Sequence, residues 1–445
     1  MAEVKETAES SPDVAQGWPG ESRSFLVIDA GYFLTQEVIR ALKAEGHRVA
    51  VIPLRLPDDS GRPDPEHYVA FLQILVHAAV YLKPDALLTI NHLGFDADGR
   101  LTELLGKMNL PALIWYVDSP RYILLNHLAN VSDRVGIFLW DQGYEPWMRQ
   151  IGYQNVHALP LATDPEIFDV DDETQGAGGT APLVFVGDSM TLALNKAFGK
   201  LPPHLRPDSS DGSGGRIAKL ADRFCQVALS LPRRKPAWEI FSELGVESLM
   251  EAVKNCSHKE DGNPEAQRRH QDQEVLLNLE SALMQIATRR QRVQLIRDIA
   301  GSPAAGDAII YGDEGWKQVV NGVVQVRPPV DYYRHLPKIY CQAGAVVNLT
   351  SLQMPSALNQ RCYDVPAAGG FLITDAQETL YQQFDPDEVV AFRSVEELLD
   401  KWNDFSRRPD DRQAVIEKGR RRILEEHTYR HRVRQMVRVA QSWFA

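Results

Sequence analysis

The sequence is poor in cysteine and in basic charge, and each shortage excludes a class of protein. The four cysteines, Cys225, Cys256, Cys341 and Cys362, form no CxxC pair and have no histidine cluster beside them. We therefore expect neither a disulfide framework nor a structural zinc site, which points to a reducing, cytoplasmic compartment. The net charge of −12 argues against a nucleic-acid partner, because proteins that bind phosphate backbones usually carry a basic face.

Long apolar runs and metal motifs are also missing. No window reaches the roughly 18 apolar residues that a membrane-spanning helix needs, and residues 1–22 lack the apolar core of a signal peptide and are expected to form a disordered tail. The acidic run at Asp96-Ala97-Asp98 has Lys107 where a calcium loop needs a carboxylate. Asp385-Pro386-Asp387 has the spacing of a metal-binding DxD motif but falls in a predicted turn. We expect no bound metal.

What the chain does have is the pattern of alternating strands and helices. At 445 residues it is long enough for two or three domains. The segments Phe25–Asp29 and His47–Ile52 read as strands on either side of a helix that runs through Leu42, which is a parallel βαβ unit. Its single Gly31, in place of GxGxxG, favours an open crevice at the strand ends over a bound dinucleotide.

Polar residues follow the next predicted strands, at 86–90, 111–117 and 136–140. Open parallel sheets gather their ligands at the carboxyl ends of strands, so these residues are candidates for a site: His92, Asp96, Asp118 and Asp141. Asp118 and His92 are the candidates for a general base, and Gly31 and Asp96 are expected to line a cleft. The alternatives are a turn-capping Asp118 and a structural His92, and Asp141 is interpreted as structural.

A second unit of the same kind begins at Pro182. Its first strand runs into the loop Gly187-Asp188-Ser189, and the boundary between the two units is expected near Leu161–Thr180, which includes the glycine-rich segment 171–180. The following residues, about 191–300, are predicted to be helical, with one long helix over Glu274–Ile299. The Ser/Gly-rich stretch at 202–215 is expected to be a loop with little order.

The stretch Ala345–Asp375 predicts the rest of this unit. We expect a buried strand over Ala345–Leu349, a helix that begins near Pro355 or Ser356 and stops at Pro366, and a second strand that ends on Asp375. A helix over 332–340 is expected to pack beneath it.

The spacing within the predicted helix after Pro355 separates two faces. Leu358, Cys362 and Val365 repeat at helical spacing and should face the sheet. Arg361 and Asp364 would then lie on the open side, where they offer a cation to a phosphate and a carboxylate to a ribose diol. An ordinary surface ion pair is the alternative.

The run RCYDVPAAGGFLITD and the later His427-Thr428-Tyr429 resemble the C-terminal domain of CgeB-type glycosyltransferase-like proteins, and NHLGFD and WYVDSP resemble the domain that accompanies it. The resemblance implies an α/β protein of the GT-B fold, in which two Rossmann-like domains with parallel sheets face each other across a cleft. Retaining GT-B enzymes have two glutamates around this helix. Here those positions hold Ser356 and Asp364.

The resemblance also implies domain limits and a donor site. The N-terminal domain would span 23–162, the C-terminal domain 163–427 with a helical insertion at about 191–300, and a last helix, 428–445 with Thr428 as N-cap, would cross back. The residues expected to bind a nucleotide-sugar are Gly187, Asp188, Ser189, Thr350, Ser351, Ser356, Arg361 and Asp364.

The function expected from this is sugar transfer from a nucleotide-sugar to an unknown acceptor, with a protein or a cell-surface glycan as candidates. No cofactor is expected, since helix N-termini and Arg361 can stabilise the departing diphosphate. Inversion and retention both remain open. The alternatives are a sugar-nucleotide-binding or assembly protein without activity and a GT-B-fold sugar-nucleotide epimerase.

Overall fold

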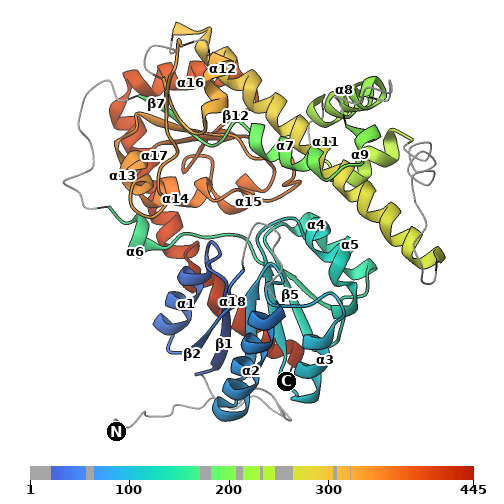
Figure 1. The fold of residues 1–445 in the computed structure, drawn as a ribbon. Helices are drawn as coiled ribbons and strands as arrows, with labels where there is room; N and C mark the ends of the chain where they lie inside the picture. Colours follow the sequence, from blue (N-terminus) through green and yellow to red (C-terminus); the bar gives the residue numbers. More distant parts are fainter. Residues whose placement is uncertain are drawn as a thin grey trace, which may run out of the picture.

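The computed structural model describes residues 22–56, 65–170, 182–206, 214–230, 234–245, 264–303, 308–320 and 322–444. These residues form two α/β domains, drawn one above the other in Figure 1, each built on a six-stranded parallel sheet. The expectations for the tail at 1–21, for the segment 171–180, for residues 207–213 and for Cys256 lie outside the described residues.

The N-terminal sheet has the strand order β2-β1-β3-β4-β5-β6. Its strands are β1 (Ser24–Asp29), β2 (Arg48–Pro53), β3 (Ala86–Ile90), β4 (Ala112–Tyr116), β5 (Val135–Leu139) and β6 (Asn155–Ala158). The three central strands β3, β4 and β5 are buried along their whole length, because helices cover both faces, and this is why they read as continuous apolar runs. The chain adds β2 on one side of β1 and β3 on the other side, so the carboxyl ends of β1 and β3 form the switch point of the sheet.

The helices of this domain are α1 (Thr35–Ala44), α2 (Pro65–Leu82), α3 (Arg100–Lys107), α4 (Pro120–Leu124) and α5 (Glu145–Gln150), and α6 (Pro165–Phe168) lies in the segment that leads to the second domain. The predicted strand at 86–90 is confirmed to the residue. None of the helices in the described ranges is long and apolar enough to cross a membrane.

The C-terminal sheet has the order β12-β11-β10-β7-β8-β9, with its switch point between β7 and β10. Its strands are β7 (Leu183–Val186), β8 (Ala308–Tyr311), β9 (Gln325–Arg327), β10 (Ala345–Asn348), β11 (Leu372–Asp375) and β12 (Val390–Phe392). The helices that cover it are α12 (Lys317–Val320), α13 (Leu336–Gln342), α14 (Arg361–Ala367), α15 (Leu380–Gln383), α16 (Val395–Arg407) and α17 (Pro409–Glu426).

Two helices of this domain begin later than predicted. Helix α14 begins at Arg361, not at Pro355 or Ser356, because the backbone N–H groups of Ser356 and Ala357 donate to the carboxylate of Asp141 in the other domain. Helix α13 begins at Leu336 instead of 332, after a turn in which Asp331 accepts from two backbone N–H groups.

The end of α14 also differs from the prediction. Pro366 does not stop the helix but lies in its last turn. The helix ends one residue later, at Ala367, and Gly369 then takes the left-handed φ of 72° that lets the chain turn into β11.

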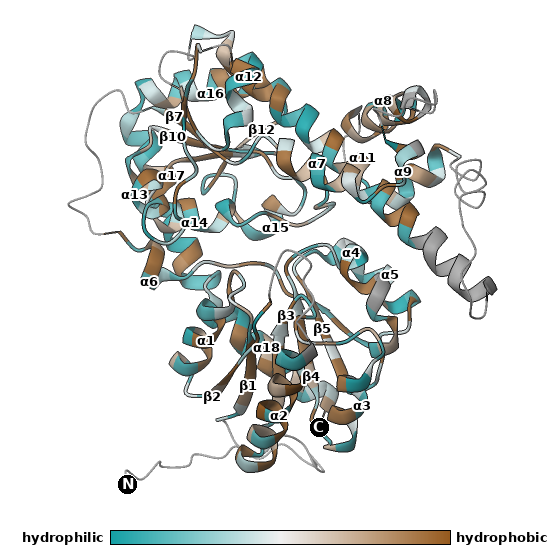
Figure 2. Cartoon of the chain, viewed as in Figure 1, coloured by the Kyte–Doolittle hydropathy of each residue, from teal (hydrophilic) through white to brown (hydrophobic). Residues whose placement is uncertain are grey.

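The helical insertion between β7 and β8 has a small core of its own. It consists of α7 (Thr191–Gly199), α8 (Gly214–Ser230), α9 (Ala237–Glu243) and α11 (Pro264–Ala300), with α11 ten residues longer at its start than predicted. The last turns of α11 pack on the C-terminal sheet through Val293, Ile296 and Ile299. Its earlier turns carry the insertion away from the sheet (Figure 1), and Figure 2 shows that α7, α8, α9 and α11 carry both hydrophobic and hydrophilic residues.

The last helix, α18 (Tyr429–Phe444), returns to the N-terminal domain and packs against α1 and β5. Arg432 donates to the backbone oxygens of Pro160 and Leu161. A Cβ atom on Gly136 of β5 would lie 2.7 Å from the ring of Trp443, so the glycine makes room for the helix. Thr428 precedes α18, and its hydroxyl contacts Nδ1 of His431 at 2.8 Å.

Candidate functional site

The glycine loop after β7 is fixed at the switch point of the C-terminal sheet. Trp316 Nε1 donates to the backbone oxygen of Gly187 at 2.8 Å, and the N–H of Ser189 donates to Asp313 at 3.1 Å. A Cβ atom on Gly312 would lie only 2.3 Å from the oxygen of Gly187, so the loops after β7 and β8 can pack together only with glycine there. The loop Gly187-Asp188-Ser189 is therefore held rigidly, with Ser189 buried and Asp188 exposed.

Two arginines converge on this loop. Arg292 of α11 donates to the carboxylate of Asp188 at 3.0 Å and to its backbone oxygen at 3.1 Å. Arg361 comes from α14, and its Nη2 lies 3.3 Å from the position that a Cβ of Gly187 would take. Burial, and then the like charge of Arg361, lower the pKa of Arg292 to about 10. The Nε atoms of both arginines have no hydrogen-bond partner among the described residues, so donors remain unused beside this loop.

Arg292 was missed by the sequence analysis. It lies in a long helix and belongs to no motif. The sequence gives one indication of its position, because the neighbouring apolar residues Val293 and Ile296 mark the turns of α11 that pack on the sheet.

Asp364 does not lie on the open side of α14, and that prediction is wrong. Its side chain is buried, and it accepts hydrogen bonds from Tyr332 and, at 2.9 and 2.8 Å, from Gln360 and Thr163. The burial raises the pKa of its carboxyl group to about 7. The sequence pattern of the helix does not reveal that Tyr332 and Thr163, from other segments, cover this side of α14.

Thr350 and Ser351 follow β10 but are also buried. The N–H and the hydroxyl of Thr350 both donate to Oδ1 of Asp375, at 2.8 and 3.0 Å. Arg234, from the segment before α9, pairs with the other oxygen of Asp375 and donates to the backbone oxygen of Ser351. Thr350 thus orients Asp375, while the hydroxyl of Ser351 lies 3.3 Å from that of Thr288.

Ser356 joins the two domains. Its N–H and hydroxyl donate to Asp141, which also accepts from Ala357 at 2.9 Å and from Gly143 at 2.8 Å. Asp141 is fully buried. Burial raises the pKa of its carboxyl group, although the four donors oppose that shift.

Asp118 lies at the carboxyl end of β4, beside the switch point of the N-terminal sheet. Its carboxylate accepts from the hydroxyl of Tyr32 and from the amide of Asn91 at 2.8 Å. Asn91 in turn accepts from the backbone N–H of Val117 at 2.9 Å. Asn91 and His92 both have left-handed backbone angles, with φ of 51° and 65°. Such conformations store strain and persist only where the surroundings hold them, so the position of Asp118 is well determined.

The other N-terminal candidates are placed less favourably. His92 is only 2% exposed, and its Nδ1 contacts the hydroxyl of Tyr116. Burial lowers its pKa well below the usual value. Asp96 does not line a cleft but accepts from the N–H groups of Arg100 and Leu101, which caps α3. Gly31 borders a separate hollow of about 430 Å³ at the ends of β1 and β2.

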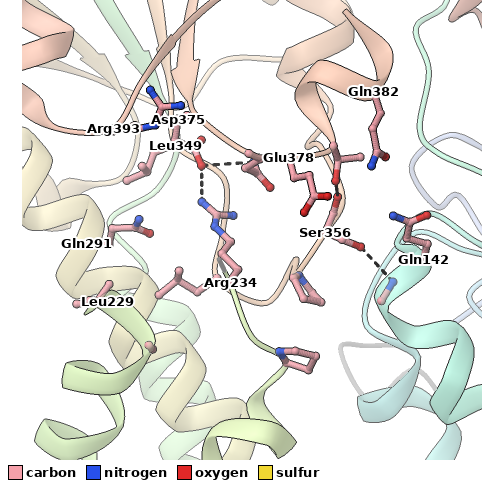
Figure 3. A pocket seen from close by; sticks show the side chains of 18 of the residues that line it. Gln142, Leu229, Arg234, Gln291, Leu349, Ser356, Asp375, Glu378, Gln382 and Arg393 are labelled. Carbon is pink, nitrogen blue, oxygen red and sulfur yellow. Dashed lines mark hydrogen bonds and ion pairs between the residues drawn. The ribbon is translucent and has the colours of Figure 1, made fainter. Parts of the chain in front are cut away.

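A cavity of about 810 Å³ opens at the carboxyl ends of β10, β11 and β12 (Figure 3). The insertion forms one wall through Arg234, Glu239 and Gln291, and the N-terminal domain reaches it with Gln142 and Gly143. Of the predicted donor residues, only Ser356 lines it. Gln291 and Arg292 are neighbours on α11, so the cavity and the arginine pair lie on two sides of one helix.

The described residues hold no group of side chains suited to a metal ion. The two acids of the DxD-like run form surface ion pairs instead, Asp385 with Arg422 and Asp387 with Lys418.

Comparison with known proteins agrees with this architecture. Residues 289–438, a third of the chain, match the family model described as "Glycosyl transferase-like". No curated protein sequence matches the chain.

Solved structures match over nearly the whole chain. The catalytic domain of starch synthase IV from Arabidopsis thaliana, bound to ADP and acarbose, is similar with a TM-score of 0.50 and 10% identity, over 95% of this chain and 99% of that one. Sucrose-phosphate synthase from Thermosynechococcus elongatus gives 0.49 and 14%, over 95% and 99%. The Anabaena protein HepE in complex with UDP-glucose gives 0.48 and 11%, over 94% and 100%. The two domains described above therefore have the GT-B fold, and the C-terminal one contains the segment that matches a glycosyltransferase-like family.

Proposed function

We propose that the protein is a glycosyltransferase that takes its sugar from a nucleotide-sugar. The observation that carries the proposal is the convergence of Arg292 and Arg361 on the glycine loop after β7. Arg292, which is buried, and Arg361, which is half-buried, have unused N–H donors, and such guanidinium groups are complementary to a diphosphate, which offers negative charge and many acceptors. The ADP in the similar starch synthase complex supports a nucleotide at this fold.

The proposed transfer depends on the charge that develops on the leaving group. As the bond between the anomeric carbon and the phosphate oxygen breaks, the nucleoside diphosphate leaves with the electron pair, and the two arginines stabilise the growing charge. The acceptor oxygen forms the new bond to the anomeric carbon. We propose that its proton passes to Asp118, whose carboxylate is fixed by Tyr32 and Asn91. No metal cofactor is needed in this scheme, and we assign the chain to the CgeB-type branch that its motifs resemble.

Calorimetry tests the donor site directly. UDP-glucose, ADP-glucose, UDP and ADP are titrated into the parent and into Arg292→Gln and Arg361→Gln. Loss of one charge-assisted contact should weaken nucleotide binding about ten- to hundredfold. Arg290→Gln is a matched control, since Arg290 lies on the same helix but pairs with Asp222 at the surface.

The outcomes separate the alternatives. Equal affinity in the parent and both variants would overturn the arginine site. If a nucleotide-sugar binds but is neither transferred to any acceptor in a cell extract nor isomerised, the protein is a binding or assembly protein. Conversion of the free donor to an epimer would show an epimerase instead.

A further inference from the structure

Helix α2 has an apolar outer face that no other described element covers. Its inner face, with Phe71, Leu75 and Ala79 at helical spacing, is buried on β1 and β2. The hydrophobic residues of the helix are brown in Figure 2. Twelve large apolar side chains are exposed in the described ranges, and five of them belong to α2: Val69, Ile74, Val80, Tyr81 and Leu82. A patch of this kind marks a surface that another molecule covers.

The outer face has the spacing with which one helix receives another. A shallow hollow of about 500 Å³ is lined by α2 alone. Four of the lining residues are spaced three or four positions apart, and we call them the α2 seam: Val69, Gln73, Val76 and Val80. This spacing keeps side chains on one side of a helix and is the pattern by which paired helices interdigitate. None of the four is charged, so the partner must present an uncharged face as well, because a charge buried there would lose its water without gaining a counter-ion.

The charged residues at the two ends of the α2 seam have opposite signs. Glu66 lies in the first turn, three positions before Val69, and Lys83 directly follows the helix, three positions after Val80. Both are exposed, and neither has an ion-pair partner among the residues that the structure describes. If two copies of α2 pack antiparallel, the first turn of one lies beside the end of the other. Glu66 of each copy then meets Lys83 of the other.

We propose that two copies of this chain form a symmetric dimer through the outer faces of their α2 helices, packed antiparallel. A two-fold interface uses one patch twice, so the patch must be complementary to itself. An uncharged seam with opposite charges at equal distances beyond its ends meets this condition. The inference does not rest on the proposed function.

The size of the face sets the strength of the dimer. A helix of 18 residues is about 27 Å long and about 10 Å wide. Such a face is smaller than the roughly 800 Å² that each partner buries in an interface of standard size. We therefore expect a dimer that forms at micromolar concentrations and dissociates on dilution.

A membrane surface fits this face less well. Helices that lie on membranes carry lysine and arginine along their polar side, and anionic lipids attract basic segments. Helix α2 contains neither lysine nor arginine, and the chain has a net charge of −12. A second copy is therefore the better partner.

The mass of the full chain in solution tests the dimer. Sedimentation equilibrium over a series of concentrations should show the average mass rising from one chain to two. Val69→Glu places a carboxylate in the α2 seam and should raise the dissociation constant at least tenfold. Val323→Glu is the matched control, because Val323 is 55% exposed, against 54% for Val69, but lies in the C-terminal domain. It should dimerise as the parent does, and thermal melts of dilute protein should show both variants folded.

Charge reversal tests the antiparallel arrangement. Glu66→Lys and Lys83→Glu each bring like charges together and should weaken the dimer about two- to fivefold. The double variant exchanges the charges and should regain parental affinity. Single reversals without effect, or a double variant that recovers nothing, would overturn this arrangement.

Three further outcomes would overturn the proposed partner. The first is a parent that stays monomeric or dimerises no better than Val69→Glu. The second is binding of the parent to phosphatidylserine vesicles that Val69→Glu abolishes, since it would identify a membrane face. The third is dimerisation only after deletion of residues 1–21, which would identify that segment as the cover. Nucleotide binding, titrated on the same variants, should equal that of the parent, so failure of the dimer and failure of the proposed function are distinguished.

Discussion

Arg121 of the N-terminal domain and Glu280 of the helical insertion form a bidentate ion pair, with Nε–Oε1 and Nη2–Oε2 distances of 3.0 and 2.8 Å. Both side chains are largely buried, at 13% and 5% exposure. The guanidinium group also lies over the rings of Trp147 and Trp238, 5.1 and 4.6 Å from their centres. This ion pair therefore attaches the insertion, which belongs to the C-terminal domain, to the N-terminal domain.

Glu280→Gln should destabilise the protein by about 3 kcal/mol, because it leaves the Arg121 charge buried without its partner. Urea unfolding measures the loss, and the radius of gyration in solution shows whether the insertion separates from the N-terminal domain. Glu103→Gln, which breaks an exposed pair with Lys107, serves as control and should change neither quantity. An unfolding midpoint for Glu280→Gln equal to that of the parent would contradict the fastening role.

Asp364 should make stability depend on pH. Its folded pKa of about 7 lies above the usual 3.8, so its contribution is fully present below about pH 4 and is lost as pH rises through 7. A shift of this size corresponds to about 4 kcal/mol between the two limits. Asp364→Asn should therefore flatten the curve of unfolding free energy against pH. Asp387→Asn, at an exposed pair, should leave the curve unchanged, and a parallel curve for Asp364→Asn would refute the assignment.

Asp118→Asn and His92→Ala should behave differently. The asparagine variant should fold normally and bind nucleotide-sugar but transfer sugar about 10²–10⁴-fold more slowly, since a general base is lost. His92→Ala removes a buried ring that contacts Tyr116 and Phe95 and should lower the unfolding temperature instead. Stopped-time transfer assays and thermal melts on both variants separate the roles. Parental transfer rates in Asp118→Asn would place the base elsewhere.

Reductant should not alter thermal unfolding. Cys225, Cys341 and Cys362 are buried, and none of them forms a disulfide within the described part of the chain. Burial raises the pKa of the Cys362 thiol to about 12, which keeps it in the unreactive protonated form. Melts with and without dithiothreitol check this, and a marked drop in melting temperature with reductant would reveal a disulfide that involves Cys256.

The sequence predicted the central strands well because they are short apolar runs, and several others end at or just before proline, glycine or aspartate, where local chemistry decides the boundary. It failed at α14, where the start of the helix depends on Asp141, which lies more than 200 residues earlier in the chain. The burial of Asp364 was missed for the same reason, because its partner Thr163, in the segment between the domains, is similarly far from it in the sequence. Arg361 was found because a motif surrounds it. Arg292 belongs to no motif, and only the packing of α11 on the sheet brings it to Gly187.

The return of α18 to the N-terminal domain has a consequence for the order of events on the ribosome. Strands β1 to β6 leave the ribosome long before residues 429–444 are made. Until then Gly136 lacks its contact with Trp443, and the carbonyl groups of Pro160 and Leu161 lack their donor, Arg432. Until then the nascent domain exposes the apolar surface that the helix later covers, at Phe138 among others. The N-terminal domain is therefore synthesised first but can complete its fold only after the whole C-terminal domain has been translated.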